Sequence, residues 1–114
     1  MSEDRELLKL AAKAAGIEIV NCTCGNEKCP FKYALGGTRR GHWNPLADDG
    51  DALRLAVNLK IDIEWQATSI HPLPHVEAYR RDDEAGIHYC ASEHENDYRR
   101  AIVRAAAEIG KDMP

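Results

Sequence analysis

The sequence predicts an α+β domain in which three helices pack on a small, largely antiparallel or mixed sheet of three to four strands. Apolar residues recur at helical spacing in three stretches, near 4–15, 49–59 and 93–109. Residues 61–66 alternate apolar and polar side chains, as a half-buried strand does. Short connections favour antiparallel pairing, and 114 residues are enough for one domain, 1–114.

The first helix is expected near residues 4–15, because both of its ends carry suitable residues. Ser2 or Asp4 can accept bonds from the free amides of the first turn. Gly16 supplies the left-handed conformation that commonly stops a helix. Its apolar face consists of Leu7, Leu10, Ala11 and Ala14. The letters IEIV at 17–20 then predict a short strand.

The segment at about 21–46 is expected to be an irregular excursion, rich in cysteine and arginine. Only FKYALGG, at 31–37, resembles a further strand, which the glycine pair would end. We expect the rest to run over the surface between a strand and a helix.

The second helix is predicted to begin at Asp48 or Asp49, which suit the N-cap position. Leu53 and Val57 widen its apolar stripe, so we expect this helix to be well buried. The stripe itself consists of Ala52, Leu55, Ala56 and Leu59. We interpret Asp48, Asp49 and Asp51 as capping residues, since a calcium loop needs oxygen ligands spread through twelve residues.

The alternation at 61–66 is typical of a strand with one solvated face. The two faces consist of Ile61, Ile63 and Trp65, and of Asp62, Glu64 and Gln66. Residues 76–81 and 87–91 are predicted to form a hairpin, with Gly86 in its turn.

The last helix is expected from about Glu93 to Ile109. Ser92 with Glu95 fits a capping box, and Gly110 is expected to end the helix. Its buried stripe is predicted to be Tyr98, Ile102, Ala105 and Ile109.

The composition is that of an ordinary globular protein, with 44% apolar and 30% charged residues. No apolar run approaches the roughly 20 residues that cross a bilayer. The acidic start MSEDRELLKL lacks the basic region followed by an apolar stretch that marks a signal peptide, so we expect a cytoplasmic protein without membrane partners. Cysteines in the cytoplasm stay reduced or bind metal.

Three of the four cysteines, Cys22, Cys24 and Cys29, form the pattern C-x-C-x4-C. Three thiolates in eight residues can bind a tetrahedral zinc ion, with Cys90, His42 or His88 as fourth ligand. The common structural spacing is a pair of C-x2-C motifs, and buried reduced cysteines also act as small apolar residues. Zinc is therefore one of two interpretations of this cluster.

Basic and aromatic residues are interleaved in the same segment, and all 19 acidic residues of the chain lie outside residues 28–47. Cations and rings together are the features of single-strand nucleic-acid binding, but the net charge of −4 and the absence of a named motif argue against it. We favour the alternative, a solvated loop whose aromatic residues Phe31, Tyr33 and Trp43 dock onto the core.

Catalysis is the least supported class. Cys90 and His88 are an i, i+2 pair on one face of a predicted strand, and such a pair can support thiol chemistry. No nucleophile elbow, glycine-rich phosphate loop or H-E-x-x-H motif occurs. We therefore expect no enzyme and assign no catalytic residue.

Three stretches resemble a group of small phage and prophage proteins, the phage ABA sandwich domain family. They are WNPLADDGDALRLAVNL at 43–59, RRAIVRAAAEIGK at 99–111 and the opening DRELLKLAAKAAGI. The resemblance implies a phage-encoded accessory protein with an alpha-beta-alpha sandwich fold, and offers no catalytic residues. Because Asp62, Glu64 and Gln66 form a wet face, we expect their strand at a sheet edge or a partial second helical layer.

The leading hypothesis is a non-enzymatic accessory protein that binds a host or phage protein. We expect its binding surface between Lys32 and Trp43, formed by Lys32, Arg39, Arg40 and Trp43. The alternatives are a zinc-stapled module, in which metal orders residues 21–43, and a nucleic-acid-binding protein.

Overall fold

The computed structural model of this protein describes residues 2–22, 30–33, 41–66, 75–82 and 86–113. In chain order the elements are α1 (Ser2–Ala15), β1 (Ile19–Asn21), β2 (Phe31–Tyr33), β3 (His42–Trp43), α2 (Asp49–Leu59), β4 (Ile61–Gln66), β5 (His75–Asp82), β6 (Gly86–His94), the 3₁₀ turn η1 (Glu95–Asp97) and α3 (Tyr98–Lys111).

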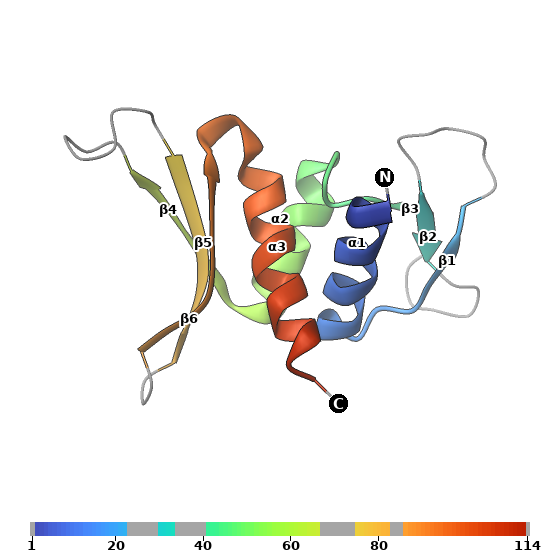
Figure 1. Cartoon of the computed structure of the whole chain (residues 1–114). Helices are drawn as coiled ribbons and strands as arrows, with labels where there is room; N and C mark the ends of the chain where they lie inside the picture. Colours follow the sequence, from blue (N-terminus) through green and yellow to red (C-terminus); the bar gives the residue numbers. More distant parts are fainter. Residues whose placement is uncertain (1, 23–29, 34–40, 67–74, 83–85, 114) are drawn as a thin grey trace.

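The three helices lie between two small sheets (Figure 1). Strands β1, β2 and β3 form one antiparallel sheet, which we call sheet A, and β4, β5 and β6 form the other, sheet B. The predicted α+β class, with three helices and antiparallel strands, is confirmed. The sequence predicted a single sheet of three to four strands, whereas the described strands are divided between two sheets.

Sheet A combines strands that were predicted with one that was not. Strand β1 overlaps the strand predicted at 17–20 and β2 lies within the one predicted at 31–37, whereas β3 was not predicted. Strand β2 is its centre and pairs with β1 on one side and β3 on the other. The rings of Phe31 and Trp43 are 2% and 1% exposed, and they share the core with Leu8 of α1 and Leu55 of α2. Burial of these two rings against the helices thus stabilises three very short strands, which form a second sheet. Residues 34–37 of the predicted strand lie outside the described residues.

Sheet B follows the predicted pattern closely. Strand β4 spans the predicted range, and Asp62 and Glu64 on its solvated face are exposed. The strand lies at the edge of the sheet, as its wet face led us to expect. The predicted hairpin is confirmed as β5 and β6, which extend beyond the predicted strands. Gly86, which was predicted to lie in the turn, instead begins β6 and pairs with Asp82. The turn residues, 83–85, lie outside the described residues.

A β-bulge interrupts the pairing of β5 with β6. Ala78 pairs with Ala91, but the next pair is Arg80 with His88, so two residues of β6 oppose one of β5. Tyr89, one of the two, has a φ of 57°. An extra residue of this kind shifts the alternation of side chains along a strand.

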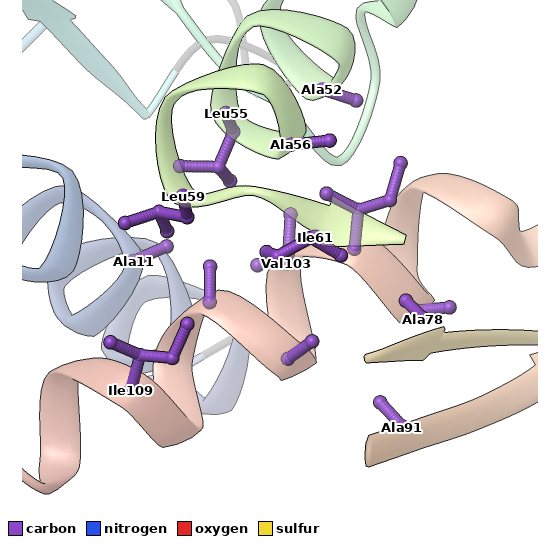
Figure 2. Close-up of a cluster of buried hydrophobic side chains, with 14 of the residues drawn as sticks. Ala11, Ala52, Leu55, Ala56, Leu59, Ile61, Ala78, Ala91, Val103 and Ile109 are labelled. Carbon is purple, nitrogen blue, oxygen red and sulfur yellow. The ribbon is translucent and has the colours of Figure 1, made fainter. Parts of the chain in front are cut away.

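Helix α3 packs closely on its neighbours through small side chains. Figure 2 shows Val103 and Ile109 of α3 among core side chains from α1, α2 and sheet B. The prediction that Gly110 ends this helix is wrong, because α3 continues to Lys111. A Cβ atom at Gly110 would overlap the carbonyl oxygen of Leu10, so glycine permits the close approach of α1. The buried small residues of α3 include Ala101, Ala105, Ala106 and Ala107.

The predicted end of α1 and start of α2 are confirmed, whereas the predicted start of α3 is wrong. Helix α1 stops before Gly16, whose φ is 69°. The Asp48 side chain caps α2 by accepting a bond from the Asp51 amide at 2.7 Å. The predicted capping box at Ser92 is wrong, because β6 continues through Ser92 and α3 begins only at Tyr98. The strand pairing with β5 overrides the local capping signal.

Candidate functional site

The outer face of sheet A carries one predicted binding residue and two predicted zinc ligands. Val20, Lys32 and His42 occupy one row across the three strands, because Lys32 pairs with both of the others. Cys22 follows β1 two residues beyond Val20, and its amide donates to the Pro30 carbonyl at 3.1 Å. The ends of the β1–β2 connection are therefore held together at Cys22.

Cys22 and His42 lie side by side, although they are 20 residues apart in sequence. The Cys22 Sγ atom is 3.3 Å from the His42 Nδ1 atom. His42 was one of the candidates for the fourth zinc ligand. Cys24 and Cys29, the other predicted ligands, lie outside the described residues. Among the residues that are described, no group of three or more His, Cys, Asp or Glu side chains is arranged for metal binding.

The rings of this segment belong to the core rather than to a surface. Trp43 was expected on the exposed binding surface, and this is wrong because its side chain is fully buried. Phe31 is buried too, with the Arg5 guanidinium 4.6 Å from its ring centroid. The alternative in which the rings dock onto the core is thus confirmed for both, and a nucleic-acid surface loses two of its three stacking rings. Arg39 and Arg40 lie outside the described residues.

Of the aspartates at the start of α2, Asp48 has the predicted capping role, while Asp51 makes other structural contacts. Asp51, which is buried, accepts a bond from the Asn44 amide at 2.9 Å and pairs with Arg54 at 2.5 Å. Its carboxylate thus joins the end of β3 to the first turn of α2. Together with the Asp48 cap, these bonds account for the acidic cluster without a cation.

The thiol of Cys90 is poorly suited to catalysis. Burial, and then the negative charge of Glu77, raise the pKa of the Cys90 thiol. A nucleophilic cysteine needs the opposite shift, since the thiolate is the reactive form. The side chain of His88, the predicted neighbour of Cys90, lies outside those that the structure describes.

Helix α2 carries more apolar residues than its buried face holds. The prediction that Leu53 and Val57 widen the buried stripe is wrong, because each is 60% exposed. Their i, i+4 spacing makes them neighbours on the helix surface, and Asp49 precedes them by one turn on the same face. The surplus was visible in the sequence, since these two residues extend an already complete stripe. Sequence alone did not reveal that nothing in the described chain covers them.

Trp65, near the end of β4, adds a ring to this exposed apolar surface. It is 61% exposed, whereas Ile61 at the start of the same strand is buried. The Trp65 ring centroid lies 6.0 Å from that of Tyr98 in a tilted arrangement, which is a favourable aromatic contact. Tyr98 also donates to Asp49, which lies one turn before Leu53 on α2. We call the surface that these contacts link the α2–β4 face; it consists of Leu53, Val57, Trp65 and Tyr98.

Asp49 forms a fixed polar rim at one end of the α2–β4 face. It accepts bonds from the Tyr98 hydroxyl at 2.5 Å and from Arg99 Nη1 at 2.6 Å. The bond from Tyr98, and then that from Arg99, lower the pKa of the Asp49 carboxyl. The same contact with Asp49 raises the pKa of the Tyr98 hydroxyl. At neutral pH the pair is therefore a carboxylate and a neutral phenol, which hold each other in place.

A polar hollow of about 180 Å³ lies beside the start of α3. Its two cations are already engaged, since Arg99 pairs with Asp49 and Arg100 pairs with Asp4 at 2.9 Å. Small-molecule sites are mostly apolar with a few convergent polar groups. This hollow lacks the apolar lining, so it does not support a substrate site. Its lining consists of Asp4, Leu46, Asn96, Asp97, Arg99 and Arg100.

Within the described ranges, no helix is long and apolar enough to cross a membrane. The search for similar proteins was negative: no protein-family model, curated protein or solved structure matches this chain.

Proposed function

We propose that this chain is a phage-encoded accessory protein that acts in the host cytoplasm by binding a host or phage protein, without catalysis. The phage origin rests on the resemblance at 43–59 and 99–111. The binding role rests on the α2–β4 face, where Leu53, Val57 and Trp65 are all at least 60% exposed. Exposed apolar residues that gather on one surface are typical of protein interaction sites.

The position of the binding surface differs from the one that the sequence suggested. Trp43 contributes to the core, and Lys32 is half-buried beside His42. The α2–β4 face offers apolar side chains together with an aromatic ring, which interface cores favour. Asp49 and Arg99 supply a polar rim.

A pull-down with matched variants tests this proposal. Tagged protein, a Leu53→Ser/Val57→Ser variant and a Lys9→Ser/Lys13→Ser control on α1 are incubated with lysates of uninfected and phage-infected bacteria. We expect one host or phage protein to be retained by the natural chain and the control, and lost by the apolar variant. Thermal melting should show that all three chains are folded. Equal retention by all three would count against this surface.

A zinc-stapled module is the second candidate, favoured by the contact between Cys22 and His42. Two ligands of one tetrahedral zinc ion, one sulfur and one nitrogen, are about 3.5 Å apart at ordinary bond lengths. The separation of Cys22 Sγ and His42 Nδ1, 3.3 Å, is close to that value. Cys24 and Cys29 would complete the set of four.

Native mass spectrometry with and without a chelator tests the zinc proposal. We expect one zinc ion per chain, released by the chelator and absent from Cys22→Ser and His42→Ala variants. Cys90→Ser, which changes the one cysteine outside the cluster, should keep the metal. A metal-free mass for the untreated protein, purified with zinc present, would rule the proposal out.

A further inference from the structure

We propose that the open edge of β4 receives an extended segment of the partner protein as an additional strand of sheet B, with apolar and basic side chains in alternation. This inference rests on the proposed protein-binding function and specifies the chemistry of the partner. Among the described strands β4 has a single neighbour, β5, along all six of its residues. Alternate residues of such a strand direct their N–H and C=O groups toward the open side, which is the arrangement used in strand addition.

The inner side of an added strand would meet the α2–β4 face. Strand β4 begins directly after α2. The ring contact of Trp65 with Tyr98 and the hydrogen bond from the Tyr98 hydroxyl to Asp49 also link the end of β4 to the first turn of α2. Ile61 is buried but Trp65 is mostly exposed, so the rest of the chain covers less of the inner face of β4 toward the end of the strand. An incoming strand that places apolar side chains on this face would cover Trp65, Leu53 and Val57.

The outer side of the same strand would meet negative charge. Asp62 and Glu64 are exposed on the solvated face of β4, and Glu64 pairs with Glu77 of β5. Oppositely charged cross-strand pairs stabilise a sheet, while like charges directly opposite each other destabilise it. Lysine or arginine at the outward positions of the added strand therefore complements this face.

The same acids disfavour a second copy of the chain as the occupant. Two β4 strands paired about a two-fold axis must place residues of the same face opposite each other. A centre at residue 63 sets Asp62 against the other copy's Glu64. Centres at 62 and 64 set Asp62 against Asp62 and Glu64 against Glu64. Each of these three registers thus places two carboxylates opposite each other. An added strand with basic residues at these positions avoids that repulsion.

The test uses an eight-residue peptide in which lysine alternates with valine, added to the ¹⁵N-labelled full chain and followed by NMR. We expect shifts and slower hydrogen exchange at alternate amides of Ile61–Gln66, and a shift of the Trp65 indole but not of the Trp43 indole. A counterpart in which glutamate replaces lysine should bind at least about tenfold more weakly, because its charges oppose the acids.

Backbone methylation separates strand addition from simple charge attraction. Two further lysine–valine peptides are N-methylated, one at odd residues and the other at even residues. Only one set of amides faces β4, so one peptide should lose binding and the other should keep it. Equal binding by both, or no shift of any β4 amide at millimolar peptide, would overturn the proposal.

Variants of the protein sharpen the same test. Asp62→Asn/Glu64→Gln and Leu53→Ser/Val57→Ser should each weaken the lysine–valine peptide, while Lys9→Ser/Lys13→Ser should not. Sedimentation equilibrium should give a monomer, and a dimer that protects Trp65 would assign the edge to a second copy instead. If retention in the pull-down depends on Leu53 and Val57 but the two methylated peptides bind equally well, the protein-binding proposal stands and the strand-addition proposal is wrong. If no protein is retained through these residues, the proposed function itself fails.

Discussion

The two sheets flank the same three helices, yet they are attached to them in different ways. Sheet A has strands of three, three and two residues, whereas those of sheet B have six, eight and nine. On its inner face sheet A buries two large rings, Phe31 and Trp43. Sheet B instead buries Val76, Ala78 and Ala91 against the alanine-rich α3.

This difference indicates which changes each side of the molecule can tolerate. A short sheet held by two rings depends on large side chains that fill space, so truncation should harm it most. The side of the molecule where backbones approach closely depends on small residues, so enlarging one of these residues should destabilise it most. The α2–β4 face belongs to neither side, because its apolar residues lie mostly outside the packed interior.

The largest expected effect is that of Trp43→Ala. Removing a buried tryptophan costs about 3–5 kcal/mol of the free energy of unfolding. Trp65→Ala is the matched control, since the same substitution at a side chain that is 61% exposed should cost only about 0.5–1.5 kcal/mol, the contribution of its ring contact with Tyr98. Urea unfolding followed by circular dichroism measures both. Similar losses in the two variants would contradict the assignment of one ring to the core and the other to the surface.

Gly110→Ala tests the small-residue side. The added methyl group would overlap the carbonyl oxygen of Leu10, so α1 and α3 must separate. Overpacking of this kind costs about 1–3 kcal/mol, although alanine favours helix more than glycine does. Glu108→Ala, at an exposed position of the same helix, should be nearly neutral. A Gly110→Ala variant at least as stable as the natural chain would show that the helices are not in close contact here.

Asp51 tests the join between sheet A and α2. Asp51→Ala leaves the Asn44 amide without its carboxylate acceptor and should cost about 1–3 kcal/mol. Asp51→Asn keeps one oxygen that can accept this bond and loses only the charge that pairs with Arg54, so it should cost less. Thermal melting of both variants gives the order. An asparagine variant less stable than the alanine variant would contradict this assignment.

The smallest effect concerns the pH dependence of the Asp49 contacts. Because the hydrogen bonds from Tyr98 and Arg99 lower the folded pKa of Asp49 below its ordinary value of 3.8, these bonds stabilise the fold above that pH and lose their contribution as the pH falls through the folded pKa. Asp49→Asn should therefore reduce the loss of stability on acidification between about pH 5 and pH 2. Urea midpoints across that range measure the slope. An unchanged slope would show that Asp49 is not engaged with Tyr98 and Arg99 in solution.

Local patterns in the sequence were sufficient for much of the fold. The alternation at 61–66 gave the limits of β4, Gly16 marked the end of α1, and Asp48 marked the start of α2. Each of these signals acts through the backbone of a few neighbouring residues. Such local signals can therefore be recognised in a single sequence.

The candidate site was much harder to predict, because burial depends on what other elements cover. Trp43 and Trp65 are the same residue type and both lie in strands, yet only Trp43 is fully covered by the rest of the chain. Leu53 and Val57 continue a helical stripe that the neighbouring elements leave open. The contact between Cys22 and His42 depends on the pairing of three strands, which no local pattern specifies.

The central claim is that the α2–β4 face, rather than the outer face of sheet A, recognises the partner. Photo-crosslinking tests it most directly, with a photoreactive residue at position 53 in one chain and at position 32 in another, in the same bacterial lysates. We predict a discrete adduct from position 53 that disappears with the Trp65→Ala change, and none from position 32. An adduct from position 32 alone would contradict the account.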